Sequence, residues 1–174
     1  MLKAALDNQA EHIVMSLGGI GSFDAGAGML QALGAKFYDD EANIVDVSDG
    51  AYKIKYIRRI DLSGVHPQLA KVNIQLMSDF SSRLYGKKSE IMQTYESLEL
   101  SQNEAAEIDN LIWYFSELFK NELKIAMGPI ERGGAGGGIA AVLNSLYQAE
   151  ILTSHELVNQ ITHLENLIQQ ADLI

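Results

Sequence analysis

The chain has 174 residues, 47% of them hydrophobic, a formal net charge of −10 and no cysteine. This length fits one domain, residues 1–174, with a sizeable core. The absence of cysteine excludes disulfides and thiol catalysis, and the acidic balance disfavours nucleic-acid and anionic-membrane partners. The N-terminus lacks a signal-peptide core, and no apolar run approaches the roughly 20 residues that span a bilayer. A soluble cytoplasmic protein is the simplest interpretation.

The first part of the chain reads as a strand, a glycine loop and a helix. Residues 12–17 (HIVMSL) form a short apolar run that is typical of a strand buried on both faces of a parallel sheet. Glycines then cluster within residues 18–28. A helical pattern follows through Leu33, with Gly34 as the residue that ends it.

Three further short strands are predicted from apolar or alternating runs at residues 35–38, 60–62 and 71–77. The last of these runs ends at Asp79. Residues 80–100 are polar and indicate no clear element.

The second half begins with the strongest helix signal in the chain. Ser101 and Glu104 match a capping box, and the apolar residues within 108–119 then recur at helical spacing. A second glycine-rich stretch, residues 133–138, opens a helix predicted over residues 139–148.

The last residues predict another capped helix. Thr153 and Glu156 form a second capping box. The helix that follows carries apolar residues at Leu157, Val158, Ile161, Leu164 and Ile168. Residues 171–174 read as the entry to a strand, and residues 1–10 as a helix tail. The alternation of strands and helices predicts an α/β fold, three-layered, with a mostly parallel sheet.

The glycine loop at residues 18–28 is the first candidate binding site. After a buried strand, such a loop lets a ligand approach the backbone, and the following helix N-terminus favours anions. Asp24 within it either caps the helix or faces a substrate. The loop lacks the Gly-Lys-Ser/Thr of a Walker A motif and is no clean dinucleotide fingerprint. A purely structural role in tight turning remains an equal alternative.

Two further features suggest chemistry. The glycines at 133–138 open a helix in the same way, with a flexible turn as the alternative. Asp79 follows a strand, and a carboxylate at that edge of an α/β sheet can hold Mg²⁺ or act as a base. Taken by itself, Asp79 is better interpreted as a turn cap. The four histidines lack metal-ligand spacing and are interpreted as structural or surface residues.

The two glycine loops resemble those of the bacterial glycerate kinase family. Residues 18–35 (GGIGSFDAGAGMLQALGA) resemble its signature GGSATNDGGAGMxxALGA in order and spacing. Residues 60–69 resemble its IDxSGLxPxL, and Asp79 stands where the family has the Asp of CDVTNPL. Residues 133–143 (GGAGGGIAAVL) resemble its GAGAAGGxGAAL loop and helix. The matches run over nearly all of the chain.

The sequence also departs from the family pattern. Phe23 replaces the family's Asn, and the Asn-Pro after Asp79 is missing. The GPQKGA segment is not recognisable in residues 92–101. The family's opening strand motif with its DSFK-like residues is absent, and so is the GEGRxD motif expected directly after Ile174. We therefore expect the chain to correspond to the central part of such a protein, most of one domain of a two-domain kinase.

In that family the reaction moves the γ-phosphate of ATP to D-glycerate, with Mg²⁺, between two α/β domains. The resemblance implies catalytic roles for Asp24 and Asp79, with Asp79 also a candidate metal ligand. It implies substrate or phosphate binding by a set of loop residues: Gly18, Gly19, Gly21, Ser22, Gly26, Gly28, Gly134, Gly136, Gly137 and Gly138. The two glycine loops are expected to converge on one cleft.

Three interpretations of the function remain open. The first is a piece of a glycerate kinase, inactive as an isolated chain. The second is a degenerate paralogue that binds a ligand or partner without catalysis, supported by the changes at Phe23 and after Asp79. The third is a half-enzyme that needs a complementing chain. Apolar surface that another domain would cover also predicts self-association.

Overall fold

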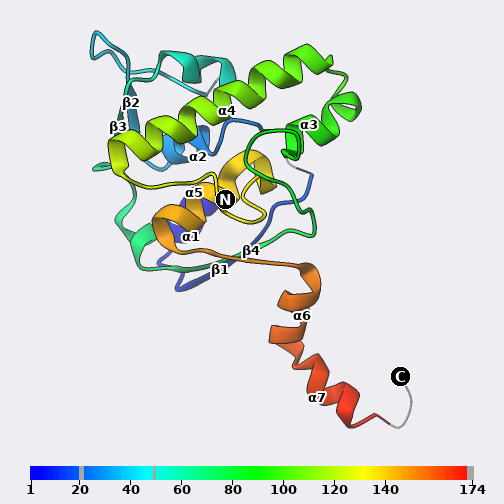
Figure 1. The fold of residues 1–174 in the computed structure, drawn as a ribbon. Coiled ribbons are helices and arrows are strands. Elements are labelled where there is room, and N and C mark those ends of the chain that lie inside the picture. Colours follow the sequence, from blue (N-terminus) through cyan, green and yellow to red (C-terminus); the bar gives the residue numbers. More distant parts are fainter. Residues whose placement is uncertain (20–21, 49, 172–174) are drawn as a thin grey trace.

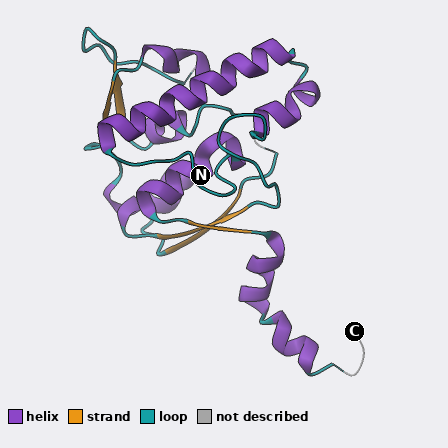
Figure 2. Cartoon of the chain, viewed as in Figure 1, coloured by secondary structure: helices purple, strands orange, loops and turns teal. Residues whose placement is uncertain are grey.

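The computed structural model describes residues 1–19, 22–48 and 50–171. Its strands are interspersed among helices along the chain (Figures 1 and 2). In order they are α1 (Leu2–Asp7), β1 (His12–Ser16), α2 (Ala27–Ala32), β2 (Lys36–Tyr38), η1 (Ala51–Tyr56), β3 (Arg59–Asp61), η2 (Pro67–Ala70), β4 (Asn73–Met77), α3 (Glu90–Thr94), η3 (Tyr95–Leu98), α4 (Gln102–Leu123), η4 (Ala135–Gly138), α5 (Ile139–Tyr147), β5 (Glu150–Leu152), α6 (Ser154–Thr162) and α7 (Leu164–Gln169).

The larger sheet is parallel, with strand order β1-β4-β5. Ile13 of β1 pairs with Ile74 of β4, and both belong to a core in which α1 and α5 cover this face. The opposite face is open, since Val14 of β1 is 53% exposed. The prediction that β1 is buried on both faces is therefore wrong. Its apolar run does not show which side the helices cover.

A second core joins α4 to the small antiparallel sheet of β2 and β3. Phe115 of α4 meets Phe37 of β2 edge-to-face, with ring centroids 5.7 Å apart, and it contacts Phe119, one turn further along the helix, in a tilted arrangement. In Figure 1, α1 and α5 lie above β1 and β4, and α4 lies above these helices. The α/β class and the parallel sheet are confirmed, with the sheet as an outer layer.

Helix α4 begins as its sequence predicts. The Ser101 side chain accepts a hydrogen bond from the Glu104 backbone N–H (3.3 Å), and the Ser101 N–H donates to the Glu104 carboxylate (2.8 Å). This reciprocal cap satisfies two backbone donors that the helix itself leaves unpaired.

The last two helices project away from the rest of the chain (Figure 1). The predicted capping box at Thr153 and Glu156 is present. However, the single helix predicted after it is wrong, because the chain breaks at His163 (φ 51°) into α6 and α7. Leu157 at the start of the stripe is buried, but Ile161 is 66% exposed, so the later part of the stripe is not packed and holds no continuous helix in place. The strand predicted at residues 171–174 lies almost wholly outside the described residues.

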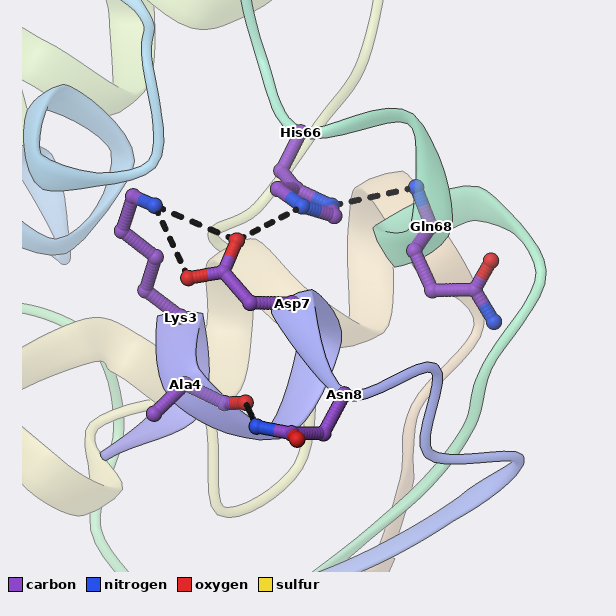
Figure 3. A network of polar contacts seen from close by, with 6 residues as sticks. All are labelled: Lys3, Ala4, Asp7, Asn8, His66 and Gln68. Carbon is purple, nitrogen blue, oxygen red and sulfur yellow. Dashed lines mark hydrogen bonds and ion pairs between the residues drawn. The ribbon is translucent and has the colours of Figure 1, made fainter.

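Helix α1 is tied to η2 by a polar network around Asp7 (Figure 3). The Asp7 carboxylate lies 3.0 Å from Lys3 Nζ and 3.3 Å from His66 Nε2. His66 Nδ1 accepts a hydrogen bond from the Gln68 N–H (3.2 Å), which leaves Nε2 as the ring's donor. His66 therefore has a structural role, as expected.

Helices with the length and apolar character needed to cross a bilayer do not occur in the described part of the chain.

Candidate functional site

A cavity of 540 Å³ lies at the carboxyl ends of β1 and β4. Parallel α/β sheets bind their ligands at this edge. The predicted site residues Gly18, Gly19 and Asp79 line it together with Phe23 and Glu90. The remaining lining residues are Ser16, Leu17, Met77, Ser78, Phe80, Thr94, Ser97 and Leu98. We call this space the strand-end cavity.

Asp79 acts as a cap, one of the roles that the sequence left open, and it also lies at the strand-end cavity. Its Oδ1 accepts a hydrogen bond from the Ser154 N–H (2.8 Å), so it caps the start of α6. The same residue lines the strand-end cavity. Hydrogen bonds from Ser154, with the positive charge of Arg132, hold the pKa of Asp79 below its usual range. Asp79 is therefore a stably ionised carboxylate at the cavity wall.

Asp24 is turned toward its own loop. Its Oδ1 accepts from the Gly26 N–H (2.9 Å) and its Oδ2 from the Gly28 N–H (2.8 Å). The residue is only 8% exposed. Of the two roles predicted for Asp24, the geometry shows the cap at the entry to α2.

A second cavity of 710 Å³ lies on the other side of Phe23, and we call it the loop cavity. Ser22, Asp24 and Gly28 line it, whereas Asp79, Gly18 and Gly19 line the strand-end cavity. Phe23 and Leu98 line both cavities. The described residues thus distribute the predicted site over two neighbouring cavities rather than one cleft. Gly21 lies outside the described residues.

The two glycine loops are in direct contact. The Ala25 N–H donates to the Gly137 carbonyl (2.9 Å). A Cβ on Gly137 would overlap the carbonyl oxygen of Ser22, and one on Gly138 would lie 2.5 Å from the Ala25 Cα. The loops therefore lie together, as predicted, rather than on opposite faces. The reason for the second loop's glycines is close backbone packing.

The glycines of the second loop are buried behind the first. Four predicted binding residues fall here: Gly134, Gly136, Gly137 and Gly138. Neither cavity has any of them in its described lining. Gly26 of the first loop is buried in a similar way, since a Cβ on it would lie 3.1 Å from Val142. A ligand reaches these glycines only if the loops move.

Glu90 is a functional candidate that sequence reasoning missed. Its side chain is half-buried in the strand-end cavity, and its Oε2 accepts a hydrogen bond from the Gly137 N–H (3.4 Å). Burial raises the pKa of Glu90, and the N–H groups of Gly137 and Gly136 partly offset that rise. A Ser before a Glu, at Ser89, signals a helix start, but nothing in the sequence relates Glu90 to a loop 47 residues further on.

Both cavities lack positive charge. In the described residues, no Lys or Arg lines the strand-end cavity or the loop cavity. Carboxylate oxygens suit a hard cation such as Mg²⁺, and Asp79 and Glu90 offer them. Within residues 1–19, 22–48 and 50–171, however, no three acidic, His or Cys side chains gather to hold a metal ion. An anionic ligand must therefore find its counter-charge elsewhere.

Comparison with known proteins identifies the family. The family model described as the glycerate kinase family matches residues 1–174, the whole chain. The chain belongs to the glycerate kinase family. It is 30% identical to a glycerate kinase of Halalkalibacterium halodurans and 29% identical to a glycerate 2-kinase of Escherichia coli, in each case over all of this chain and 45% of the relative.

A solved structure is similar over nearly the same span. The crystal structure of a glycerate kinase 2 candidate from Salmonella typhimurium LT2 superimposes with a TM-score of 0.87 and 29% identity. The match covers 98% of this chain and 45% of that one. The family and fold expected from the glycine loops are thus confirmed, and the chain spans less than half the length of these relatives.

Proposed function

We propose that this chain supplies the D-glycerate-binding part of a cytoplasmic kinase that transfers the γ-phosphoryl group of ATP to D-glycerate. The observation that carries the proposal is the strand-end cavity of a glycerate kinase-family chain, lined by the motif residues Gly18, Gly19 and Asp79. Its 540 Å³ lies within the roughly 300–1,000 Å³ of small-molecule sites and exceeds what one glycerate needs.

The two carboxylates of this cavity suit different tasks. In the transfer, a glycerate oxygen bonds to the γ-phosphorus, the bond from that phosphorus to the oxygen of ADP breaks, and the glycerate hydroxyl loses a proton. Two acids whose environments push their pKa values apart divide such work. Glu90, with its raised pKa, is the better proton acceptor, and Asp79, with its lowered pKa, is the better ligand for Mg²⁺.

Counter-charge is what the described lining of the strand-end cavity and the loop cavity lacks. Phosphoryl transfer depends on positioning and on neutralising the phosphate oxygens. Neither cavity provides a Lys or Arg from the described residues. We therefore propose that Mg²⁺ and the part of the protein that the relatives have beyond this chain supply it. The purified chain is expected to show little or no ATP-dependent phosphorylation of D-glycerate in a coupled assay, and robust turnover would contradict this.

Binding of D-glycerate tests the site itself. In ¹⁵N-glycine-labelled chain with Mg²⁺ present, D-glycerate should shift the amide signals of Gly18 and Gly19 and leave that of Gly86 unchanged. Asp79→Asn should abolish the shifts. The matched control is Asp39→Asn, since Asp39 is a partly exposed carboxylate that also accepts a backbone N–H, from Asn43 at 2.8 Å. Absence of shifts in the unsubstituted chain, with and without ATP, would contradict the proposal.

A second function, ligand binding without phosphoryl transfer, is favoured by the apolar wall. Phe23 stands where the family signature has Asn, and with Leu98 it forms lining common to both cavities. If the chain only binds a ligand, glycerate or a related hydroxy acid should still shift the amide signals of Gly18 and Gly19. Turnover would then stay absent when the part that the relatives have beyond this chain is supplied, whereas the kinase proposal requires turnover to appear.

A further inference from the structure

A small basic cavity lies beside the second glycine loop, apart from the two cavities described above. It has a volume of 150 Å³. Its lining residues come from the segment after β4 and from the turn before η4: Ser81, Ser82, Arg83, Lys88, Glu131 and Arg132. We call it the basic cavity.

The charge of this cavity is opposite to that of the protein. Arg83, Lys88 and Arg132 bring three positive charges against the single carboxylate of Glu131. The whole chain has only 13 Lys and Arg and a net charge of −10. A positively charged cleft concentrates anions from solution. Three cations around one cavity in an acidic chain therefore point to an anionic ligand.

These cations are not consumed by ion pairs. The salt bridges of the described residues involve Lys3, His66 and Lys120. The Arg83 guanidinium donates to the Pro129 carbonyl (3.4 Å), which leaves most of its donors for a ligand. Arg132 is near enough to Asp79 and Glu156 to lower the pKa of each, yet it pairs with neither.

Ser82 provides an independent observation. The residue is 1% exposed, and its Oγ has no hydrogen-bond partner in the part of the chain that the structure describes. Its carbonyl accepts from the Gly134 N–H (3.3 Å), which fixes its position at the cavity wall. A buried polar group without a hydrogen-bond partner destabilises the fold. A ligand oxygen that reached this hydroxyl would offset that destabilisation.

We propose that the basic cavity binds a phosphate-type oxyanion, held by Arg83, Lys88 and Arg132 with a hydrogen bond from Ser82. Its 150 Å³ is well below the roughly 300–1,000 Å³ of pockets for whole small molecules. It therefore takes inorganic phosphate or the phosphoryl end of a larger ester, and it is too small to enclose a whole nucleotide. Guanidinium groups bind such oxyanions with two parallel hydrogen bonds. The proposal does not depend on glycerate kinase activity, because its residues line neither other cavity.

Calorimetric titration of the full chain tests this site, with inorganic phosphate in one arm and glycerol 3-phosphate in the other, at constant ionic strength in chloride. Saturable binding is expected. The double variant Arg83→Gln and Arg132→Gln should weaken it about tenfold or more, since each loses charge-assisted hydrogen bonds. Lys87→Gln is the matched control, because Lys87 is exposed beside Lys88 but does not line the cavity. Its affinity should be unchanged.

A second variant separates binding from folding. Ser82→Ala removes a hydroxyl that has no partner, so the free protein should become no less stable while phosphate binding weakens. Equal affinity in the two arms identifies free phosphate as the ligand, and tighter binding of the ester identifies a phosphorylated compound. The proposal is overturned if no saturable binding occurs, or if Lys87→Gln weakens binding as much as the double variant does.

Discussion

Replacing Gly137 with Ala should push the two glycine loops apart. Gly137 has a φ of +63°, and a Cβ there would overlap the Ser22 carbonyl oxygen and lie 2.6 Å from its carbonyl carbon. Gly19 has nearly the same backbone, with a φ of +66°, but an added Cβ meets no atom of the described residues within 4 Å. Gly137→Ala and Gly19→Ala therefore introduce the same backbone strain, but only Gly137→Ala also brings the new Cβ into collision with the other loop.

The structure gives a magnitude for each substitution. A left-handed backbone costs an ordinary residue about 1–2 kcal/mol, which is the whole effect expected for Gly19→Ala. Overpacking adds typically 1–3 kcal/mol. Because the obstacle at Gly137 is backbone, relief requires the loops to separate and to break the Ala25 N–H to Gly137 hydrogen bond. Gly137→Ala should therefore cost about 2–5 kcal/mol, a large part of a typical domain's stability.

Urea unfolding followed by circular dichroism measures both variants against the unsubstituted chain. With unchanged m-values, the difference in midpoint gives the difference in unfolding free energy. Equal losses for Gly137→Ala and Gly19→Ala would refute the reasoning, because the loops would then tolerate a side chain between them. A larger loss of unfolding free energy for Gly137→Ala than for Gly19→Ala would confirm that these glycines allow close packing of the two loops.

Three other variants test separate features. Since burial raises the pKa of Glu90, its ionisation destabilises the fold as the pH rises from the ordinary pKa of 4.5 through the raised value. Glu90→Gln should therefore be as stable as the parent chain below this pH range and more stable above it. Parallel curves of stability against pH would contradict this. Ser101→Ala should cost about 0.5–2 kcal/mol in urea unfolding, since it removes the cap of α4. Ile161 and Leu167 are 66% and 56% exposed, so the chain should self-associate in sedimentation experiments across a concentration series. Changing both residues to Lys should reduce the association. A parent chain that stays monomeric would contradict this prediction.

The elements that could be predicted from sequence are those whose signals are local. The capping box at Ser101 and the apolar spacing after it lie within one helix, so α4 was predictable. The same signals at Thr153 predicted α6 but not its end at His163. Apolar spacing fixes which side of a helix is buried only when something packs on it. Since Ile161 remains exposed, its spacing carried no information about how far the helix continues.

Contacts between distant segments were beyond the reach of sequence patterns. Glu90 meets the second glycine loop through a hydrogen bond that spans 47 positions. No spacing rule relates them, because the approach depends on how α3 and η4 pack. The family signature identified the first loop and Asp79, which do meet at the strand-end cavity. It did not distinguish glycines that face a ligand from glycines that let two backbones touch, since both uses demand the same residue.

Asp24 shows how a motif can be matched while its geometry stays undetermined. Phe23 and Asp24 are neighbours, so the sequence places both in one binding loop. In the structure Phe23 lines both cavities, whereas Asp24 lines only the loop cavity and gives its oxygens to the Gly26 and Gly28 N–H groups. Those two glycines are part of the signature itself. The Gly28 N–H uses the Asp24 carboxylate as its hydrogen-bond acceptor, so the loop requires this carboxylate whether or not a substrate does. Retention of Asp24 beside a changed residue 23 is therefore explained by loop folding alone, and Asp79 and Glu90 are the carboxylates at which to look for chemistry.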